Sequence, residues 1–340
     1  MPKLVLDNGV IIEEEKGISE AIVGYFCSLF QYAPTSNFHP FLQEIEPKVT
    51  NQMNAELTRP FSDLDAEQSL KQMKPLMAPG HDGMPPFFFN SYWSVVGNYV
   101  IEVVLSVLNT RVIPSNINHT FISLIPKIKS PTNPVSLCNA IYKIISKTIA
   151  NCLKKIIPKL VYETQSAFMS DRLISDNILI AFETLHHLKN KRKGKLGFMA
   201  LKVDISKAYD RVEWNFLEKI MERLGFDIKW ISLISCCIRT VSFSILVIGE
   251  PRGLIHPSRG LRQGDPLLPY LFLLCAEGLH SLIQQAENCG DLHGVSLCRE
   301  GPKVSHLFFA DDSLLFCRTN DKDYQVALDI LDTYERASGQ

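Results

Sequence analysis

The 340-residue sequence has little net charge and no apolar run long enough to cross a membrane. Its formal net charge of −1 gives no global field that would favour nucleic acid or a lipid surface as a partner. The longest apolar run, around residues 267–276, contains proline and is far shorter than the roughly 20 residues of a membrane helix. The opening "MPKLVLDNGV" lacks the basic and long apolar regions of a signal peptide, so we expect no membrane partner.

The nine cysteines are odd in number, scattered, and never arranged as Cys-x-x-Cys or as a Cys/His cluster. This spacing argues against a structural zinc site. Several cysteines lie in apolar segments such as "LFLLCAEGL" (271–279), which is typical of buried free thiols. The pattern therefore predicts a protein of a reducing compartment.

Charge is unevenly distributed along the chain. Residues 1–75 contain six Lys/Arg and eleven Asp/Glu, a net of 6 − 11 = −5. Residues 123–195 contain thirteen Lys/Arg and four Asp/Glu, a net of 13 − 4 = +9. A basic segment in a neutral protein suits a partner of negative charge. On charge alone, solvated helix faces are the better interpretation.

Hydrophobic periodicity predicts strands and helices that do not alternate strictly, which favours an α+β fold. Residues 141–157 predict an amphipathic helix with Lys143, Lys147, Lys154 and Lys155 mostly on its polar face. The other predicted elements are a helix over 178–188 capped by Asp176, a strand over 196–205, a helix from Ser206 that ends at Gly225, a strand over 242–253 with a turn at 249–251, a glycine-bearing loop that opens a long helix with Pro266 and Pro269 near its start, a hairpin over 307–316 and a helix over 323–339.

Two places bring carboxylates to the ends of apolar strands. Asp204 ends one strand, and Asp311 and Asp312 form the turn of the hairpin "LFFADDSLLF" 107 residues later. An ordinary solvated turn, a metal site and chance are the three explanations, and the first is favoured for an isolated acidic turn. If the strands are neighbours, three carboxylates meet at one sheet edge. Oxygen ligands of this kind suit Mg²⁺, and two such ions support phosphoryl transfer.

Three segments that occur in a fixed order favour the metal site over the ordinary solvated turn. They are "KVDISKAYDRVEW" (202–214), "RGLRQGDPLLPYLFLL" (259–274) and "FADDSLLF" (309–316). Together they resemble the reverse transcriptases of non-LTR (LINE-type) retrotransposons, most closely those of plants. The resemblance continues through "MAPGHDGMPPFFF" (77–89), "HTFISLIPKIKSPT" (119–132) and residues 136–177, so it covers the chain from about residue 59 to the end. It implies an α+β right-hand polymerase with fingers and palm.

The resemblance implies roles for the acidic residues and for one aromatic residue. Asp204 and Asp311 would be the ligands of two Mg²⁺ ions, with Mn²⁺ as a possible substitute, and Asp312 would be the accompanying catalytic carboxylate. Tyr209 would exclude the ribose 2′-hydroxyl and so favour deoxynucleotides. The alternative for Tyr209 is a core aromatic on the following helix.

The resemblance also implies contacts with the incoming dNTP, the RNA template and the DNA primer. Gln263 and Gly264 would lie beside the nucleotide and template, and glycine lets backbone approach a ligand closely. Arg262 and Arg259 would meet phosphates, or else be surface charges. Further phosphate contacts, independent of base sequence and sensitive to salt, are expected from the fingers. The candidates are Lys127, Lys129, Lys154, Lys155 and the run "KNKRKGK" (189–195).

The resemblance divides the chain into two parts. Residues 1–58 would be an acidic leading segment that links to an endonuclease domain of the full-length element, and residues 59–340 would be fingers and palm, truncated before a thumb. Such elements act in the nucleus, with the cytoplasm as the other expected location.

Two alternatives compete with an active reverse transcriptase. "SPTNPVSLCN" (130–139) lacks the Arg-Pro of an Arg-Pro-Ile-Ser-Leu element, so one alternative is an inactive retroelement remnant that at most binds nucleic acid. The other alternative is an RNA-dependent RNA polymerase. Tyr209 argues against it, because an enzyme that makes RNA has no reason to exclude the ribose 2′-hydroxyl.

Overall fold

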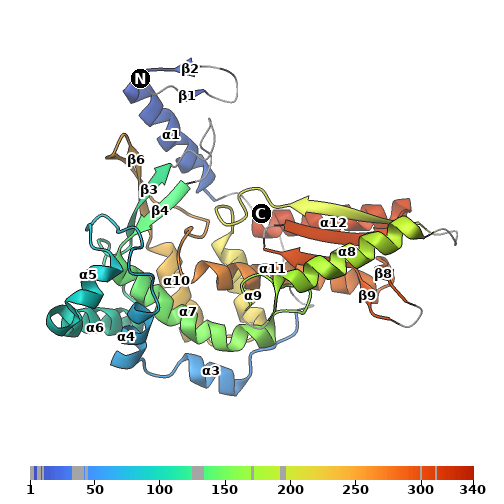
Figure 1. The fold of residues 1–340 in the computed structure, drawn as a ribbon, viewed down its shortest axis with the longest axis horizontal. Coiled ribbons are helices and arrows are strands. Elements are labelled where there is room, and N and C mark those ends of the chain that lie inside the picture. The colour runs from blue at the N-terminus through green and yellow to red at the C-terminus, as the bar shows by residue number, and fades with distance from the viewer. Residues whose placement is uncertain are drawn as a thin grey trace. The chain divides into compact units, whose positions relative to one another are not determined.

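The computed structural model describes residues 4–5, 9, 11–32, 42, 45–124, 134–169, 172–191, 197–298, 301–310 and 312–340. The chain forms two compact units, and both are assembled from segments that are distant in sequence. Unit 1 contains residues 1–32, 59–151 and 232–268. Unit 2 contains residues 33–58, 152–231 and 269–340. Figure 1 shows helices and strands intermixed along the chain, as expected for an α+β protein.

Unit 1 is built on a four-stranded sheet with the order β4-β3-β6-β7. The strands β3 and β6 are parallel, and the other neighbours are antiparallel. A two-residue turn joins β6 to β7, with positive φ at Ile248 (54°) and Gly249 (83°), which suits a tight hairpin. The bounds are β3 His119–Leu124, β4 Pro134–Cys138, β6 Ser242–Val247 and β7 Glu250–Ile255.

The helix α1 (Glu15–Leu29), from the acidic leading segment, packs on this sheet. Phe26 and Phe30 join the core that contains Phe243 and Ile245. The rings of Phe30 and Phe243 stack with centroids 5.0 Å apart. Burial of apolar side chains from both sides therefore makes α1 part of unit 1.

The other elements assigned mainly to unit 1 are helices α4, α5, α6 and α10. Their bounds are α4 Asp63–Lys71, α5 Pro86–Ser91, α6 Trp93–Thr110 and α10 Ile228–Arg239. By length and composition α6 could cross a membrane, which differs from the sequence-based expectation that no apolar run is long enough. It contacts α4 and α5, and its buried side chains are Val100, Val104, Val107 and Leu108. One such helix is weak evidence for a membrane.

The predicted basic helix is present as α7 (Ala140–Leu160), but its first half is not amphipathic. Residues 142–146 and 148–150 are buried. The prediction that Lys143 lies on a polar face is wrong, because its ammonium is buried and donates to the Ala78 carbonyl oxygen at 2.8 Å. Lys154 and Lys155, in the second half, are exposed as predicted.

Unit 2 is built on an antiparallel three-stranded sheet, β10-β11-β5. The helix α8 (Ile174–Asn190) packs on one face, where Ala181 meets Leu307 and Phe316. Figure 1 shows α8 running along these strands. The other bounds in unit 2 are β5 Phe198–Asp204, β10 His306–Phe309, β11 Asp312–Arg318, α9 Trp214–Leu224, α11 Leu268–Asn288, α12 Asp321–Ser338, α3 Asn51–Leu57 and the short pair β8 Val295–Ser296 with β9 Lys303–Val304. The short pair β1 Leu4–Val5 with β2 Ile11–Ile12 belongs to unit 1.

Several predicted boundaries need correction. The helix expected from Ser206 begins only at Trp214, because residues 206–211 form a turn. Asp176 lies in the first turn of α8 and Leu173 occupies the cap position. The segment predicted as a strand over 242–253 with a turn at 249–251 is the hairpin of β6 and β7, whose turn is residues 248–249, and α10 was not predicted.

Other predictions are confirmed. The strand that ends at Asp204, the two strands of the acidic hairpin and the long helix α11 are present. The helix α12 ends with Gly339 as a left-handed cap, at a φ of 80°.

Candidate active site

Asp204 and Asp312 lie directly opposite each other at one edge of the unit 2 sheet. Asp204 is the last residue of β5, Asp312 is the first of β11, and the two are register partners in the antiparallel ladder. Both residues are exposed. Like charges directly opposite on neighbouring strands destabilise a sheet. This edge therefore carries a repulsion that a bound cation would relieve.

Lys202 offsets part of this charge. Alternation along β5 puts Lys202 on the same face as Asp204. Its ammonium lies 3.0 Å from Oδ1 of Asp312. The hydrogen bond to Asp312 raises the pKa of Lys202, and the charges of Asp312 and Asp204 add to this effect. Both side chains of the pair are more than half exposed, so its contribution to stability is small.

The donor set at this edge fits a hard divalent cation. Carboxylate oxygens are the ligands that Mg²⁺ prefers in proteins. Within the described part of the chain no group of three His, Cys, Asp or Glu side chains is placed to hold a metal. Asp311, the second predicted ligand, lies outside the described residues, as do Lys127 and Lys129.

Two of the five non-glycine residues that have a positive φ in the described part of the chain lie beside these carboxylates in sequence. Ala310, next to Asp311, has a φ of 64°, and Lys207, three residues after Asp204, has a φ of 58°. Residues with side chains rarely adopt this left-handed conformation, and such residues persist where the surrounding structure holds them, often at functional sites. Lys207 and Ala310 therefore have the constrained backbone conformation that is common at functional sites.

Tyr209 lies in the turn between β5 and α9, not on the helix itself. Its ring is half-buried and meets the edge of the Phe272 ring from α11, with centroids 4.9 Å apart. The contact holds the ring on one side and leaves part of it exposed. The alternative of a core aromatic on the following helix is wrong in its placement, because Tyr209 lies in the turn before that helix. The role of Tyr209 stays a prediction.

The end of α12 holds this turn in place. Gln340 donates from Nε2 to the carbonyl oxygen of Ala208 at 2.7 Å, next to Tyr209. The backbone N–H of Glu213 donates to the carbonyl oxygen of Ser338 at 2.8 Å. These contacts compete with the helical hydrogen bonds of the segment and explain why the helix begins only at Trp214.

Gln263 and Gly264 belong to a turn of unit 1. Gly264 is exposed and has a φ of 79°, and a Cβ placed there would meet no atom within 4 Å. The position therefore needs glycine for its backbone conformation and has open space beside it.

Asp265 anchors this turn from within unit 1. The residue is buried, and its carboxylate accepts hydrogen bonds from the Tyr142 hydroxyl at 2.8 Å and from the Ser146 hydroxyl. Oδ1 also accepts from the backbone N–H of Leu267 at 2.9 Å. Sequence reasoning missed this role, although Asp265 stands inside the "RQGDP" segment.

Arg262 and Arg259, two predicted phosphate contacts, make contacts within unit 1. Arg262 is 7% exposed, donates to Oδ1 of Asn118 and lies 4.1 Å above the Tyr142 ring. Within the part of the chain that the structure describes, its Nε and Nη1 atoms have no hydrogen-bond partner. Arg259 donates from Nε to the carbonyl oxygen of Leu29 at 2.9 Å. Contact of either residue with phosphate stays a prediction.

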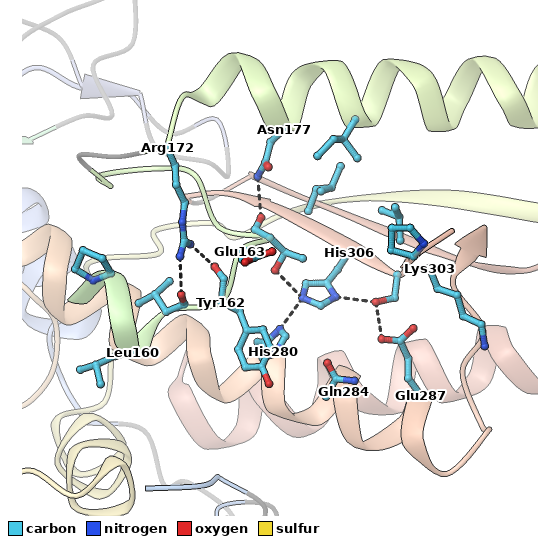
Figure 2. Close-up of a pocket in the computed structure, with 18 of the residues that line it drawn as sticks. Leu160, Tyr162, Glu163, Arg172, Asn177, His280, Gln284, Glu287, Lys303 and His306 are labelled. Carbon is cyan, nitrogen blue, oxygen red and sulfur yellow. Dashed lines mark hydrogen bonds between the residues drawn. The ribbon is translucent and has the colours of Figure 1, made fainter. Parts of the chain in front are cut away.

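Unit 2 also contains a pocket of about 630 Å³ beside β10 (Figure 2). Burial lowers the pKa of His306 to about 4 and that of His280 to about 2, and the two imidazoles are hydrogen-bonded at 2.8 Å. Both are therefore neutral near pH 7. The hydroxyl of Ser305 donates to Glu287 at 2.8 Å and lies 2.9 Å from Nδ1 of His306. This network was not predicted, because its members come from distant segments.

Comparison with known proteins matches the chain to one family. The family model described as reverse transcriptase (RNA-dependent DNA polymerase) matches residues 125–339, which is more than half of the chain. This range contains all three ordered segments of the sequence.

Individual relatives agree with the family match. An uncharacterized 149 kDa protein of transposon TX1 from Xenopus laevis is 25% identical over 98% of the chain, which spans 25% of that relative. A retrovirus-related Pol polyprotein from the type-1 retrotransposable element R2 of Popillia japonica is 25% identical over 76% of the chain, or 35% of the relative. An uncharacterized mitochondrial protein of Arabidopsis thaliana is 52% identical over 68 residues, 20% of the chain. The chain thus spans about a quarter to a third of the first and second of these relatives.

Proposed function

Because the chain belongs to the reverse transcriptase family, we propose that it supplies the fingers and palm of an RNA-directed DNA polymerase from a non-LTR retroelement. The reaction joins a dNTP to the 3′-hydroxyl of a DNA primer on an RNA template. The TX1 and R2 relatives support an origin in a non-LTR element. The Arabidopsis match is consistent with a plant source.

One observation supports this proposal above the others. Two strands from separate segments, "KVDISKAYDRVEW" and "FADDSLLF", pair so that Asp204 and Asp312 face each other at the sheet edge. An ordinary acidic turn gains nothing from a second acid placed opposite it, since like charges there cost stability. A site that binds cations needs this arrangement.

Asp204 and Asp311 are the proposed ligands of the divalent ions that this family generally uses, with Asp312 as the accompanying carboxylate. When bound, two Mg²⁺ ions lower the pKa of the attacking hydroxyl and stabilise charge on the leaving pyrophosphate. Lys202 holds the Asp312 carboxylate at 3.0 Å and reduces the negative charge of the edge. Lys207 and Ala310 hold the backbone after Asp204 and before the acidic pair in a constrained conformation, which would limit reorganisation during the reaction.

Tyr209 is the proposed filter against ribonucleotides. Its position against Phe272 restrains the ring, so a 2′-hydroxyl on the bound sugar would meet a side chain that cannot easily move. The filter acts by steric exclusion and needs no hydrogen bond. Gln263 and Gly264 are proposed contacts of nucleotide and template.

The exposed Lys154 and Lys155 are proposed contacts of nucleic-acid phosphate. This attraction is independent of base sequence and weakens with salt. We also retain as a proposal the division into a leading segment, residues 1–58, and a polymerase part, residues 59–340. The full-length element is proposed to carry an endonuclease domain and to act in the nucleus.

Primer extension tests the proposal. The purified chain is given a DNA primer annealed to RNA, dNTPs and Mg²⁺, beside Asp311→Ala and the matched surface variant Asp332→Ala. We expect Mg²⁺-dependent extension by wild type and Asp332→Ala, and a loss of at least about a hundredfold for Asp311→Ala. Equal rates for wild type and Asp311→Ala would contradict the proposed site.

The second candidate is an inactive remnant that only binds nucleic acid, favoured by the missing Arg-Pro of the "SPTNPVSLCN" segment. It predicts no extension by any variant, together with binding of the primed RNA that weakens as salt rises. Fluorescence anisotropy of a labelled primed RNA, measured at several salt concentrations, distinguishes this outcome.

A further inference from the structure

The strand β10, which leads into the acidic turn, is an edge strand of its sheet. Its outer side is covered by residues 162–165 of the segment that follows α7. The backbone N–H of Phe308 donates to the Thr164 carbonyl oxygen at 3.0 Å, and Gln165 pairs with Phe308 as an isolated parallel bridge. The position of β10 therefore depends on what holds this covering segment.

Arg172 fixes the covering segment from one side (Figure 2). Its guanidinium donates to the carbonyl oxygens of Tyr162, of Gln165 at 2.8 Å and of Val161 at 2.9 Å. A planar guanidinium with several donors suits this recognition of neighbouring carbonyls. The segment is thus held in one conformation before it meets β10.

Asn177 links this segment to β10. It stands on the buried side of α8, is 3% exposed, and donates from Nδ2 to the Thr164 carbonyl oxygen at 2.7 Å and to the Phe308 carbonyl oxygen at 3.2 Å. A buried amide without hydrogen bonds would cost free energy. The two N–H bonds of the Asn177 side-chain amide thus serve two carbonyl oxygens, one in the covering segment and one in β10.

We propose that Asn177 is a positioning residue for the metal-binding turn. It acts through Phe308, which stands three residues before Asp311. This inference rests on the proposed function. Phe308 is bonded on its N–H side to Thr164 and on its carbonyl side to Asn177, so both backbone groups of the residue are fixed. A register slip in a strand moves each side chain to the other face, and this contact opposes such a slip.

The test compares Asn177→Ala and Asn177→Ser with Thr184→Val in the full chain. Thr184 is the matched control because it is buried on the same helix and its hydroxyl donates to the Ile180 carbonyl oxygen within α8. Three quantities are measured: hydrogen exchange at the Phe308 amide, Mn²⁺ affinity by electron paramagnetic resonance, and kcat and KM for dNTP in primer extension. Thermal unfolding reports which variants are folded.

We expect Asn177→Ala to exchange the Phe308 amide faster and to bind Mn²⁺ about tenfold more weakly or worse. It should lower kcat with little change in KM for dNTP, and Asn177→Ser, which keeps one donor, should recover part of each loss. Thr184→Val should match wild type in Mn²⁺ affinity. If Asn177→Ala does not fold, Asn177→Ser carries the comparison.

Mn²⁺ affinity equal to that of Thr184→Val in a folded Asn177 variant would overturn the inference. Failure of the proposed function looks different: wild type itself would neither bind Mn²⁺ nor extend a primer. In that case unchanged exchange at Phe308 in the Asn177 variants would separately refute the link to β10.

Discussion

Replacing Asp265 by alanine should destabilise unit 1 severely. The carboxylate is 8% exposed and accepts hydrogen bonds from Tyr142, Ser146 and the Leu267 backbone. Alanine would leave the Ser146 hydroxyl and the Leu267 N–H without this acceptor, and it would leave the Tyr142 hydroxyl with the Cys237 carbonyl oxygen at 3.5 Å. It would also remove a negative charge near the buried Arg262 guanidinium. Loss of one partner from a buried charged network costs about 3–5 kcal/mol. We expect the free energy of unfolding of Asp265→Ala to fall by about that amount.

Native-state hydrogen exchange is the appropriate assay, because it reports on unit 1 separately from unit 2. The Leu267 amide should lose protection directly, and amides of residues 142–150 should follow. Asp265→Asn, which keeps one acceptor oxygen, should lose about 1–3 kcal/mol. Asp82→Ala is the control, since Asp82 accepts a single hydrogen bond from Met84 in an exposed turn. A loss in Asp265→Ala no larger than in Asp82→Ala would refute the reasoning.

Three further predictions concern the site and two ion pairs. Tyr209→Val should raise ribonucleotide incorporation relative to dNTP by about tenfold or more, measured as the ratio of kcat/KM values, and an unchanged ratio would remove the filter role. Burial raises the pKa of the Glu277 carboxyl, so the stability that this group contributes falls as pH rises from 4.5 through its folded-state pKa. The variant Lys48→Met removes the ammonium 2.9 Å from this carboxylate and should lower the free energy of unfolding by about 3–5 kcal/mol at pH 7. Denaturant unfolding measures this loss, with Lys16→Met as the control. The hydrogen bond from Arg59 lowers the pKa of Asp65 from 3.8 to about 2, so the stability that this pair contributes is present above pH 3.8 and is lost as pH falls through 2. In Arg59→Met the pKa of Asp65, measured by carboxyl-carbon NMR, should return toward 3.8. A pKa still near 2 would assign the shift to the hydrogen bonds from Ser62 instead.

The elements with strong local patterns were predictable. The strand ending at Asp204, the hairpin strands around Asp312 and the helix α12 each have regular apolar spacing and clear stop residues. The apolar run of each strand was visible in the sequence, but the pairing register that sets Asp204 opposite Asp312 was not. Register depends on contacts between segments more than 100 residues apart.

The errors have tertiary causes. Residues 206–213 have helical character, yet Gln340 and Ser338 bind the backbone of Ala208 and Glu213 and keep the turn out of the helix. Lys143 was placed on a polar face by periodicity, but the Ala78 carbonyl oxygen is a partner 65 residues away. No local pattern contains this information.

The site was predictable only in part. The ordered segments identified Asp204, Asp312, Tyr209 and Gly264 by resemblance to a family. Lys202, Asn177 and Asp265 stand inside the same quoted segments and were not identified, because their importance comes from the partners they reach. The sequence signal that could have identified Asn177 was a polar residue at a position that helical periodicity places on the buried face.

The central claim is that the carboxylates at the ends of β5 and β11 hold the ions for nucleotidyl transfer. Electron paramagnetic resonance of Mn²⁺ added with primed RNA and dNTP, using a primer that lacks its 3′-hydroxyl, tests it most directly. We predict about two bound ions in wild type and in the surface control Asp332→Asn, and fewer in Asp204→Asn. Equal Mn²⁺ binding by Asp204→Asn and wild type would contradict the claim.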